Sequence, residues 1–182
     1  MIRSLEEAWD WYRAVRTLAY DMNNLAGRWD TTECSAFVHG SNRLRDRKSV
    51  ELVSMSRTVL EELDDLAVLV LFSVFEASVR SLAVSQVEIE TAGITHVAAK
   101  RALAELKDSM SNGSFARVTD AYQRLDIELT TQVDQVRKFR NWVAHGRREA
   151  PENSVTPEEA FERLRRHLDL VRRTGGSPDR TT

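Results

Sequence analysis

The sequence predicts an all-α protein, folded as an up-and-down bundle of four to five helices. The 182 residues include only seven glycines and three prolines, and this scarcity favours long uninterrupted helices. Apolar residues recur at helical spacing, and no segment alternates in the manner of a strand. Hydrophobic residues make up 42% of the chain, which is typical of a globular protein with a real core.

The length suits one domain over residues 1–174, and the polar residues 175–182 are expected to form a disordered tail. The single cysteine, Cys34, cannot form an internal disulfide, so nothing indicates an oxidising compartment. The N-terminus has no apolar stretch after a basic region, so we expect no secretory signal. The longest apolar run, Leu66–Phe75, is too short to span a bilayer. We therefore expect a cytoplasmic protein without a membrane partner.

The first half of the chain contains two predicted helices separated by a long polar segment. Ser4 and Glu7 have the spacing of a capping box, which begins a helix that ends near Leu25. The aromatic residues of this helix are expected to pack in the core. Residues 27–48 are polar and without clear periodicity, so they predict a loop of undecided role. The next helix lies within Ser49–Glu90, which contains neither Gly nor Pro.

This second helix carries a narrow polar strip on an otherwise apolar surface. Residues Leu66–Val79 are apolar on nearly all sides, so we expect them at the centre of the bundle. The exceptions form a strip of Ser73, Glu76 and Arg80. Glu76 and Arg80 are four residues apart and can pair on one helix face, as buried charges require. The strip is either an internal salt bridge or the support of a polar active centre.

Turn and cap signals divide the second half of the chain. A helix over His96–Ser109 ends at a Ser-Asn-Gly-Ser turn, and a short helix over Phe115–Leu125 follows. Asp126 is expected to cap a helix over Ile127–His145, which Gly146 ends in a left-handed conformation.

The final helix begins with a capping box at Thr156, has Pro157 in its first helical position and runs to about Arg173. Its five arginines are interspersed with acidic residues. This balance indicates a solvated helix face.

The helix predicted over Ile127–His145 carries chemistry on two faces. One face is an apolar stripe that Arg140 interrupts, and such local violations are common at functional sites. A second, polar stripe contains Arg137, Asn141 and His145, each four residues from the next. Because Arg140 and His145 are five residues apart, they point in different directions. Two copies related by a two-fold axis could bring both groups to one cleft, which predicts a homodimer.

Basic residues gather around this helix end, although the formal net charge of the chain is only −2. They are Arg137, Lys138, Arg147 and Arg148. Their clustering favours contact with nucleic-acid phosphates over a solvated helix face.

The sequence shows no metal or cofactor site. Its four histidines are scattered and its lone cysteine has no C-x-x-C partner, so no zinc spacing exists. We therefore expect no metal and no cofactor. His96 and His167 are expected to be ordinary helix-surface residues.

The segment from Arg140 to His145, RNWVAH, resembles the R-x4-6-H motif of the HEPN family. Asn after the arginine and Gly after the histidine are both common in that family. The position near the end of a long helix, before a Thr-Pro-Glu-Glu-capped final helix, is similar as well. The buried segment LVLFSVFEASVR resembles the second main helix of the family. The resemblance covers roughly residues 50–173.

The resemblance implies a bundle that dimerises along the motif helices and cleaves RNA without a metal. It also implies that the nucleic acid bound by the four basic residues at the end of the motif helix is RNA. The ribose 2′-hydroxyl attacks the adjacent phosphate in this chemistry. His145 would transfer protons, Arg140 would hold the phosphate and stabilise developing charge, and Asn141 would orient His145 or donate to phosphate. Many members are toxins or phage-defence effectors, often controlled by an antitoxin such as a small nucleotidyltransferase.

Two other interpretations are open. In the first, the chain is a catalytically silent HEPN-like module that binds RNA, a nucleotide or a partner protein. In the second, it is a structural bundle in which Arg140 pairs with Glu76 and His145 merely caps a helix.

Overall fold

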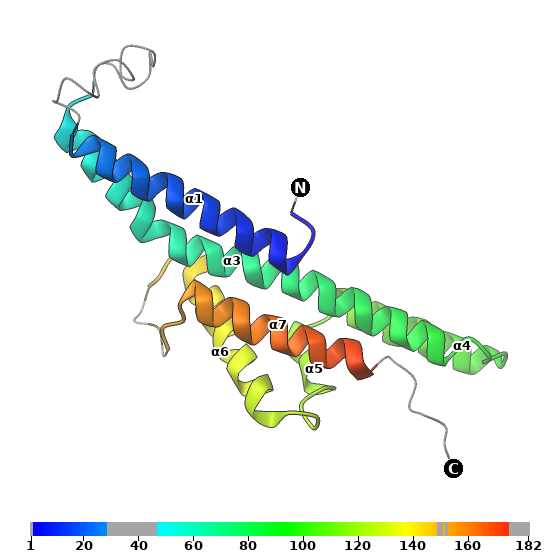
Figure 1. The fold of residues 1–182 in the computed structure, drawn as a ribbon. Helices are drawn as coiled ribbons and strands as arrows, with labels where there is room; N and C mark the ends of the chain where they lie inside the picture. The colour runs from blue at the N-terminus through cyan, green and yellow to red at the C-terminus, as the bar shows by residue number, and fades with distance from the viewer. Residues whose placement is uncertain (1, 29–46, 149–150, 152, 175–182) are drawn as a thin grey trace.

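The computed structural model describes residues 2–28, 47–148, 151 and 153–174. Within these ranges the chain forms six helices and no strand, which confirms the all-α prediction (Figure 1). The predicted tail and most of the loop after the first helix, with Cys34, lie outside the described residues. The helices are α1 (Leu5–Ala26), α3 (Ser49–Glu90), α4 (Val97–Asn112), α5 (Phe115–Asp120), α6 (Ile127–Ala144) and α7 (Pro157–Thr174).

The predicted caps are present where local sequence specified them. Ser4 Oγ accepts a hydrogen bond from the N–H of Glu7 at 3.1 Å. The carboxylate of Asp126 accepts one from an N–H three residues later at 2.8 Å. Thr156 and Glu159 form a reciprocal capping box with hydrogen bonds of 3.2 and 3.0 Å. These side chains satisfy backbone donors that the first helical turn leaves free.

One helix end was predicted wrongly. The short helix α5 ends at Asp120, whereas the sequence predicted that it continues to Leu125. Two tight turns replace its last part, because the N–H groups of Tyr122 and Leu125 each bond to a carbonyl three residues back. The described chain thus has six helices, in the order in which the sequence placed the five longer ones and the short one.

The long helix α3 is the centre of the fold, and α1, α6 and α7 pack around its N-terminal and middle parts (Figure 1). Helix α1 runs antiparallel to it. The hydroxyl of Ser49 donates to the carbonyl of Ala26 at 2.7 Å, while farther along Tyr12 donates to Asp64 at 2.8 Å. One face of the predicted core segment is buried here, with Phe72, Phe75 and Val79 among its residues. Its opposite face is open, since Leu66, Ser73 and Ala77 are exposed.

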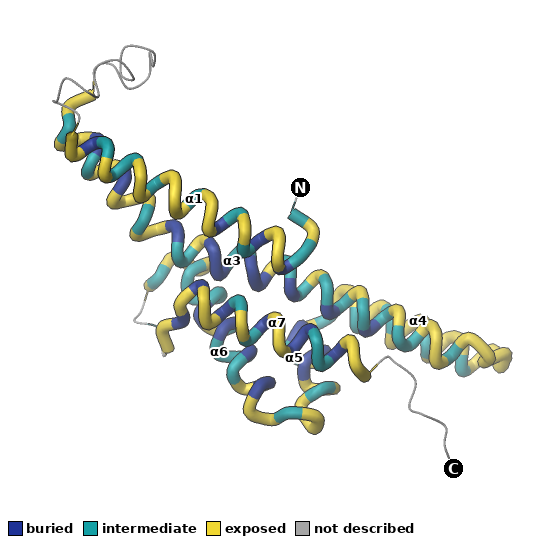
Figure 2. The backbone as a smooth tube through the Cα atoms, in the orientation of Figure 1, coloured by how far each residue is buried: buried dark blue, intermediate teal, exposed yellow. Residues whose placement is uncertain are grey.

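Beyond the bundle, the C-terminal part of α3 pairs with α4 to form a projecting arm (Figure 2). No residue of α4 is buried in the described chain. Of the described helices, only α3 is long and apolar enough to cross a membrane. The core helix of a soluble protein passes the same test, and 39% of the apolar window of α3 is buried.

His167 lies in the core, contrary to the expectation that it is a surface residue. Its ring makes edge-on contacts with Phe75 at 5.6 Å and Tyr122 at 6.2 Å between centroids. It belongs to the apolar stripe of α7 that includes Ala160, Leu164 and Val171. The helical spacing of that stripe, and not the polarity of the imidazole, decides its position.

Candidate functional site

A single carboxylate, Glu76 of α3, joins two arginines from different parts of the chain. Arg140 of α6 approaches Glu76 Oε2 through Nη2 at 2.7 Å. Arg80 reaches Glu76 Oε1 through Nη2 at 2.7 Å and through Nε at 3.1 Å. The predicted pair of Glu76 and Arg80 is therefore present. So is the pair of Arg140 and Glu76 that a structural role predicts.

Both guanidinium groups are also held by aromatic rings and backbone oxygens. Arg140 lies over the ring of Phe72 at 4.7 Å, and Arg80 lies over Phe115 at 5.3 Å. Arg80 further donates to the carbonyls of Met110 at 2.7 Å and Gly113 at 2.9 Å. These contacts dock the end of α4 and the start of α5 onto α3. The side chain of Arg140 remains 26% exposed, so one edge of it still reaches the surface.

Asn141 adjoins this cluster on the next residue of α6. Its Oδ1 accepts a hydrogen bond from Nη1 of Arg140 at 3.0 Å. Because the carboxamide oxygen is engaged, its NH2 group is directed away from Arg140. Nε of Arg140 is buried and has no hydrogen-bond partner among the described residues. The arginine thus spends two donors on Glu76 and Asn141 and retains further donor capacity.

His145 occupies the C-terminal cap of α6 and is exposed. Gly146 follows with φ 82° and Arg147 with φ 55°. The N–H of Gly146 bonds to Val143 O at 3.1 Å, and that of Arg147 bonds to Trp142 O at 3.0 Å. This is the Schellman pattern, which ends a helix with a left-handed residue as predicted for Gly146. The side chain of His145 makes no hydrogen bond within the described chain, so its imidazole is available to an external group.

Arg147 faces α3 and is held by two acidic residues there. It forms a bidentate pair with Glu62 at 3.0 and 2.8 Å and contacts Asp65 at 2.6 Å. The hydrogen bond from Arg147 lowers the pKa of the Glu62 carboxyl. Burial raises the pKa of Asp65, although Arg147 opposes this. Arg147 was predicted to bind RNA, and here its guanidinium fixes the turn that follows His145.

The other predicted RNA-binding residues differ in their surroundings. Arg137 pairs with Asp134 at 2.7 Å, and Lys138 approaches the same carboxylate at 3.7 Å. Arg148 is exposed. The basic cluster is thus partly neutralised by acidic residues of the same chain.

Sequence analysis singled out Glu76 but missed the other residues of α3 that position the motif, Glu62, Asp65 and Phe72. Glu62, Asp65, Phe72 and Glu76 recur at helical spacing and form the face of α3 that meets α6 and the turn after it. That periodicity was visible in the sequence. The partners of Glu62, Asp65 and Phe72 were not visible, because Arg147 and Arg140 lie more than sixty residues away in the sequence.

Comparison of the chain with known protein families, with curated proteins and with solved structures found no match. The resemblance to the HEPN family therefore rests on the motif residues and their helical context. Within the described ranges, no group of three or more His, Cys, Asp or Glu side chains is arranged to hold a metal ion.

Proposed function

We propose that this protein is a metal-independent endoribonuclease of the HEPN type. The observation that carries the proposal is the order of groups at the end of α6. A guanidinium and a carboxamide, Arg140 and Asn141, are joined by a hydrogen bond, and the exposed imidazole of His145 follows one turn later. Phosphodiester cleavage needs this combination of an anion-binding cation and a group that can carry a proton.

The charge of the cluster also favours a phosphate. Arg80 and Arg140 share the single negative charge of Glu76, so the three side chains retain one excess positive charge. All three are mostly shielded from water, with side-chain exposures of 17%, 26% and 22%. Charges in such surroundings attract an anion more strongly than fully hydrated ones.

In the proposed reaction, the ribose 2′-hydroxyl attacks the adjacent phosphorus and the bond to the 5′ oxygen of the next nucleotide breaks. His145 takes the proton from the 2′-hydroxyl or gives one to the departing oxygen, and a second imidazole or a water molecule performs the other transfer. Arg140 stabilises the charge that develops on the phosphate oxygens. The products are a 2′,3′-cyclic phosphate and a 5′-hydroxyl.

A homodimer belongs to this proposal. Arg140 is directed into α3 and His145 outward, so the two groups diverge within one chain. A second copy, related by a two-fold axis, would supply the histidine that faces a phosphate bound at Arg140. By the same resemblance we infer a toxin or phage-defence effector, controlled by an antitoxin such as a small nucleotidyltransferase.

One observation favours a second candidate, the purely structural helical bundle. Arg140 is already paired with Glu76 at 2.7 Å, so in this interpretation its role is to join α3 and α6. The two candidates differ in whether removal of the exposed imidazole abolishes a reaction.

The test is RNA cleavage by the purified chain in excess EDTA. We expect fragments that end in 2′,3′-cyclic phosphate. His145→Ala should slow cleavage by at least about a hundredfold, the usual contribution of a general acid or base. His96→Ala is the matched control, because His96 is exposed and lies at the start of α4. Arg140→Lys retains a cation for Glu76 and tests the guanidinium itself.

Intact RNA with tRNA, rRNA and mRNA substrates would exclude the ribonuclease. So would cleavage that survives His145→Ala. If the protein binds RNA and leaves it intact, the silent module becomes the better account.

A further inference from the structure

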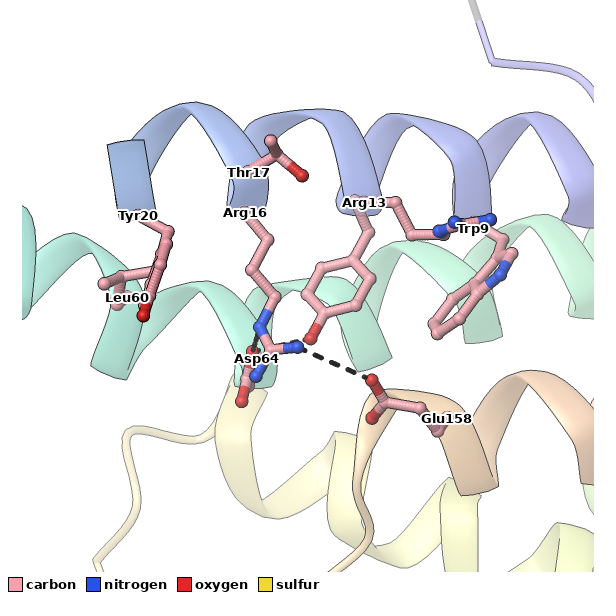
Figure 3. Close-up of a pocket in the computed structure, with 9 residues that line it drawn as sticks. Trp9, Arg13, Arg16, Thr17, Tyr20, Leu60, Asp64 and Glu158 are labelled. Atoms are coloured by element: carbon pink, nitrogen blue, oxygen red, sulfur yellow. Dashed lines mark hydrogen bonds and ion pairs between the residues drawn. The ribbon is translucent and has the colours of Figure 1, made fainter. Parts of the chain in front are cut away.

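A pocket of about 470 Å³ opens between α1, α3 and the first turn of α7, away from the Glu76 cluster (Figure 3). The exposed side of α1 contributes most of its wall. Trp9, Arg13, Arg16 and Tyr20 follow one another there at spacings of four, three and four residues. Two cations therefore lie between two aromatic rings along one helix face.

The two aromatic residues differ, because the ring of Trp9 is fixed by packing and the ring of Tyr20 is open to solvent. Trp9 is held in place by stacking on Phe161, with centroids 4.9 Å apart and planes 12° from parallel. Tyr20 is 59% exposed and lies beside Leu60 at the opposite end of the pocket (Figure 3). Eleven residues of helix separate the two rings by about 16 Å. That length is too great for one base to touch both, and it suits a short extended strand.

Of the two cations between the rings, Arg16 makes only long ion pairs with its neighbours. Arg16 approaches Asp64 at 3.9 Å and Glu158 at 3.8 Å, and its guanidinium lies 6.0 Å from the centre of the Tyr12 ring. Its side chain is 53% exposed. Exposed ion pairs at such distances contribute little to stability. Arg16 can therefore turn toward a bound anion at small cost, and Arg13 is exposed beside it.

Asp64 supplies an acceptor at the floor of the pocket. Its Oδ1 accepts the hydroxyl of Tyr12 at 2.8 Å, while the carboxylate remains 42% exposed. Burial and this hydrogen bond raise the pKa of Tyr12, so the phenol stays a donor to Asp64. An exposed carboxylate can accept the amino group of a nucleobase, which a pocket made only of cations and rings could not do.

The pocket also lies close to the motif. Asp64 is followed by Asp65, which binds Arg147 at 2.6 Å, and Arg147 is two residues beyond His145. In Figure 3 the pale yellow ribbon of this region passes beside Asp64. The pocket therefore lies level with the His145–Arg147 end of the motif on α3, whereas Arg140 meets Glu76 about three helical turns farther along.

We propose that this pocket binds a few nucleotides of single-stranded RNA, with bases stacked on Trp9 and Tyr20 and phosphates held by Arg13 and Arg16. Alternating rings and cations match the alternating bases and phosphates of a single strand. The role of the pocket as an exosite, which holds RNA next to the cleavage point, rests on the proposed ribonuclease function. Binding itself does not.

The test measures fluorescence anisotropy of a labelled 12-nucleotide single-stranded RNA with 2′-O-methyl groups, which the chain cannot cleave. Tyr20→Leu should weaken binding about tenfold, since one aromatic stack on a base contributes that much or more. Arg13→Gln should weaken binding and reduce the slope of log affinity against log salt by about 0.7. Both residues are exposed, so neither substitution threatens the fold.

Leu18→Ala and Arg57→Gln are the matched controls, because both residues are exposed and neither lines the pocket. They should bind like the wild type. If the controls weaken RNA binding equally, or if Tyr20→Leu and Arg13→Gln leave the affinity unchanged, the proposal that this pocket binds RNA is overturned. If AMP or GMP binds as tightly as the oligonucleotide, the ligand of the pocket is a free nucleotide and not a single strand.

The outcomes separate the two proposals. Cleavage that depends on His145, together with unchanged RNA binding by the pocket variants, would exclude the exosite and leave the ribonuclease proposal standing. Binding that depends on Tyr20, without any cleavage, would exclude the ribonuclease and leave the pocket as an RNA-binding site.

Discussion

Glu76 and Arg140 connect the two central helices of this fold through an ion pair of 2.7 Å. The same carboxylate holds Arg80, which in turn bonds to the backbone at the end of α4 and the start of α5. One acidic side chain of α3 therefore coordinates the packing of α4, α5 and α6. It also fixes the arginine of the proposed cleavage motif.

The first prediction concerns this carboxylate. Glu76→Gln should lower the free energy of unfolding by about 2 kcal/mol, because it leaves two mostly buried guanidinium groups without a counter-charge. Urea denaturation measures the change. Glu61→Gln, an exposed glutamate of the same helix, should change stability by less than about 0.5 kcal/mol. Equal stability of the two variants would show that the pair contributes nothing to the fold.

The second prediction assigns different roles to the adjacent residues Arg147 and Arg148. Arg147→Ala releases the turn after His145 from Glu62 and Asp65, so cleavage should fall by roughly ten- to a hundredfold through misplacement of the imidazole. RNA affinity should change less. Arg148→Ala should instead weaken RNA binding, and reduce its salt dependence, because Arg148 is exposed. Cleavage kinetics and RNA-binding isotherms of both variants distinguish these roles. If Arg147→Ala weakens RNA binding and Arg148→Ala slows cleavage, Arg147 is the residue that binds RNA.

The third prediction concerns the left-handed residue that ends α6. Gly146 has φ 82°, and a Cβ there would meet nothing within 4 Å. Gly146→Ala should therefore lower the free energy of unfolding by about 1 kcal/mol through backbone strain alone. Gly93 is equally unobstructed and has no positive φ, so Gly93→Ala should be neutral or raise stability by up to about 1 kcal/mol. Loss of stability in both variants would refute the conformational explanation.

The fourth prediction is a pH dependence that originates at His167. Burial lowers its pKa to about 4, despite an opposing influence of Asp126, and both ring nitrogens are without partners in the described structure. As the pH falls below about 6.5, the unfolded chain binds a proton that the folded chain rejects. Stability is therefore fully present at neutral pH and is lost as the pH falls toward 4.

Between pH 7 and pH 5 this loss should be about 2 kcal/mol. His167→Leu should remove that part of the pH dependence, whereas the exposed His96→Gln should retain it. Urea denaturation of the three proteins at both pH values provides the comparison. An unchanged pH dependence in His167→Leu would assign the effect to other groups.

The sequence by itself determined the helices and most of their ends. Ser4, Asp126 and Thr156 cap helices because each side chain bonds to an N–H three residues away, and such contacts are complete within one turn. The left-handed Gly146 is likewise a local feature. The buried middle of α3 followed from its apolar surface, and the chance of a pair between Glu76 and Arg80 followed from their spacing.

Only the tertiary structure decided which charges meet across helices. Arg147, which was expected to bind RNA, pairs with Glu62 and Asp65. His167 was expected at the surface and is buried. The pair of Glu76 and Arg140 was one of several open possibilities until α3 and α6 were placed side by side. Helical periodicity indicates which residues share a face. It does not indicate which face a helix turns toward a neighbour dozens of residues away, because that choice depends on the packing of the whole core.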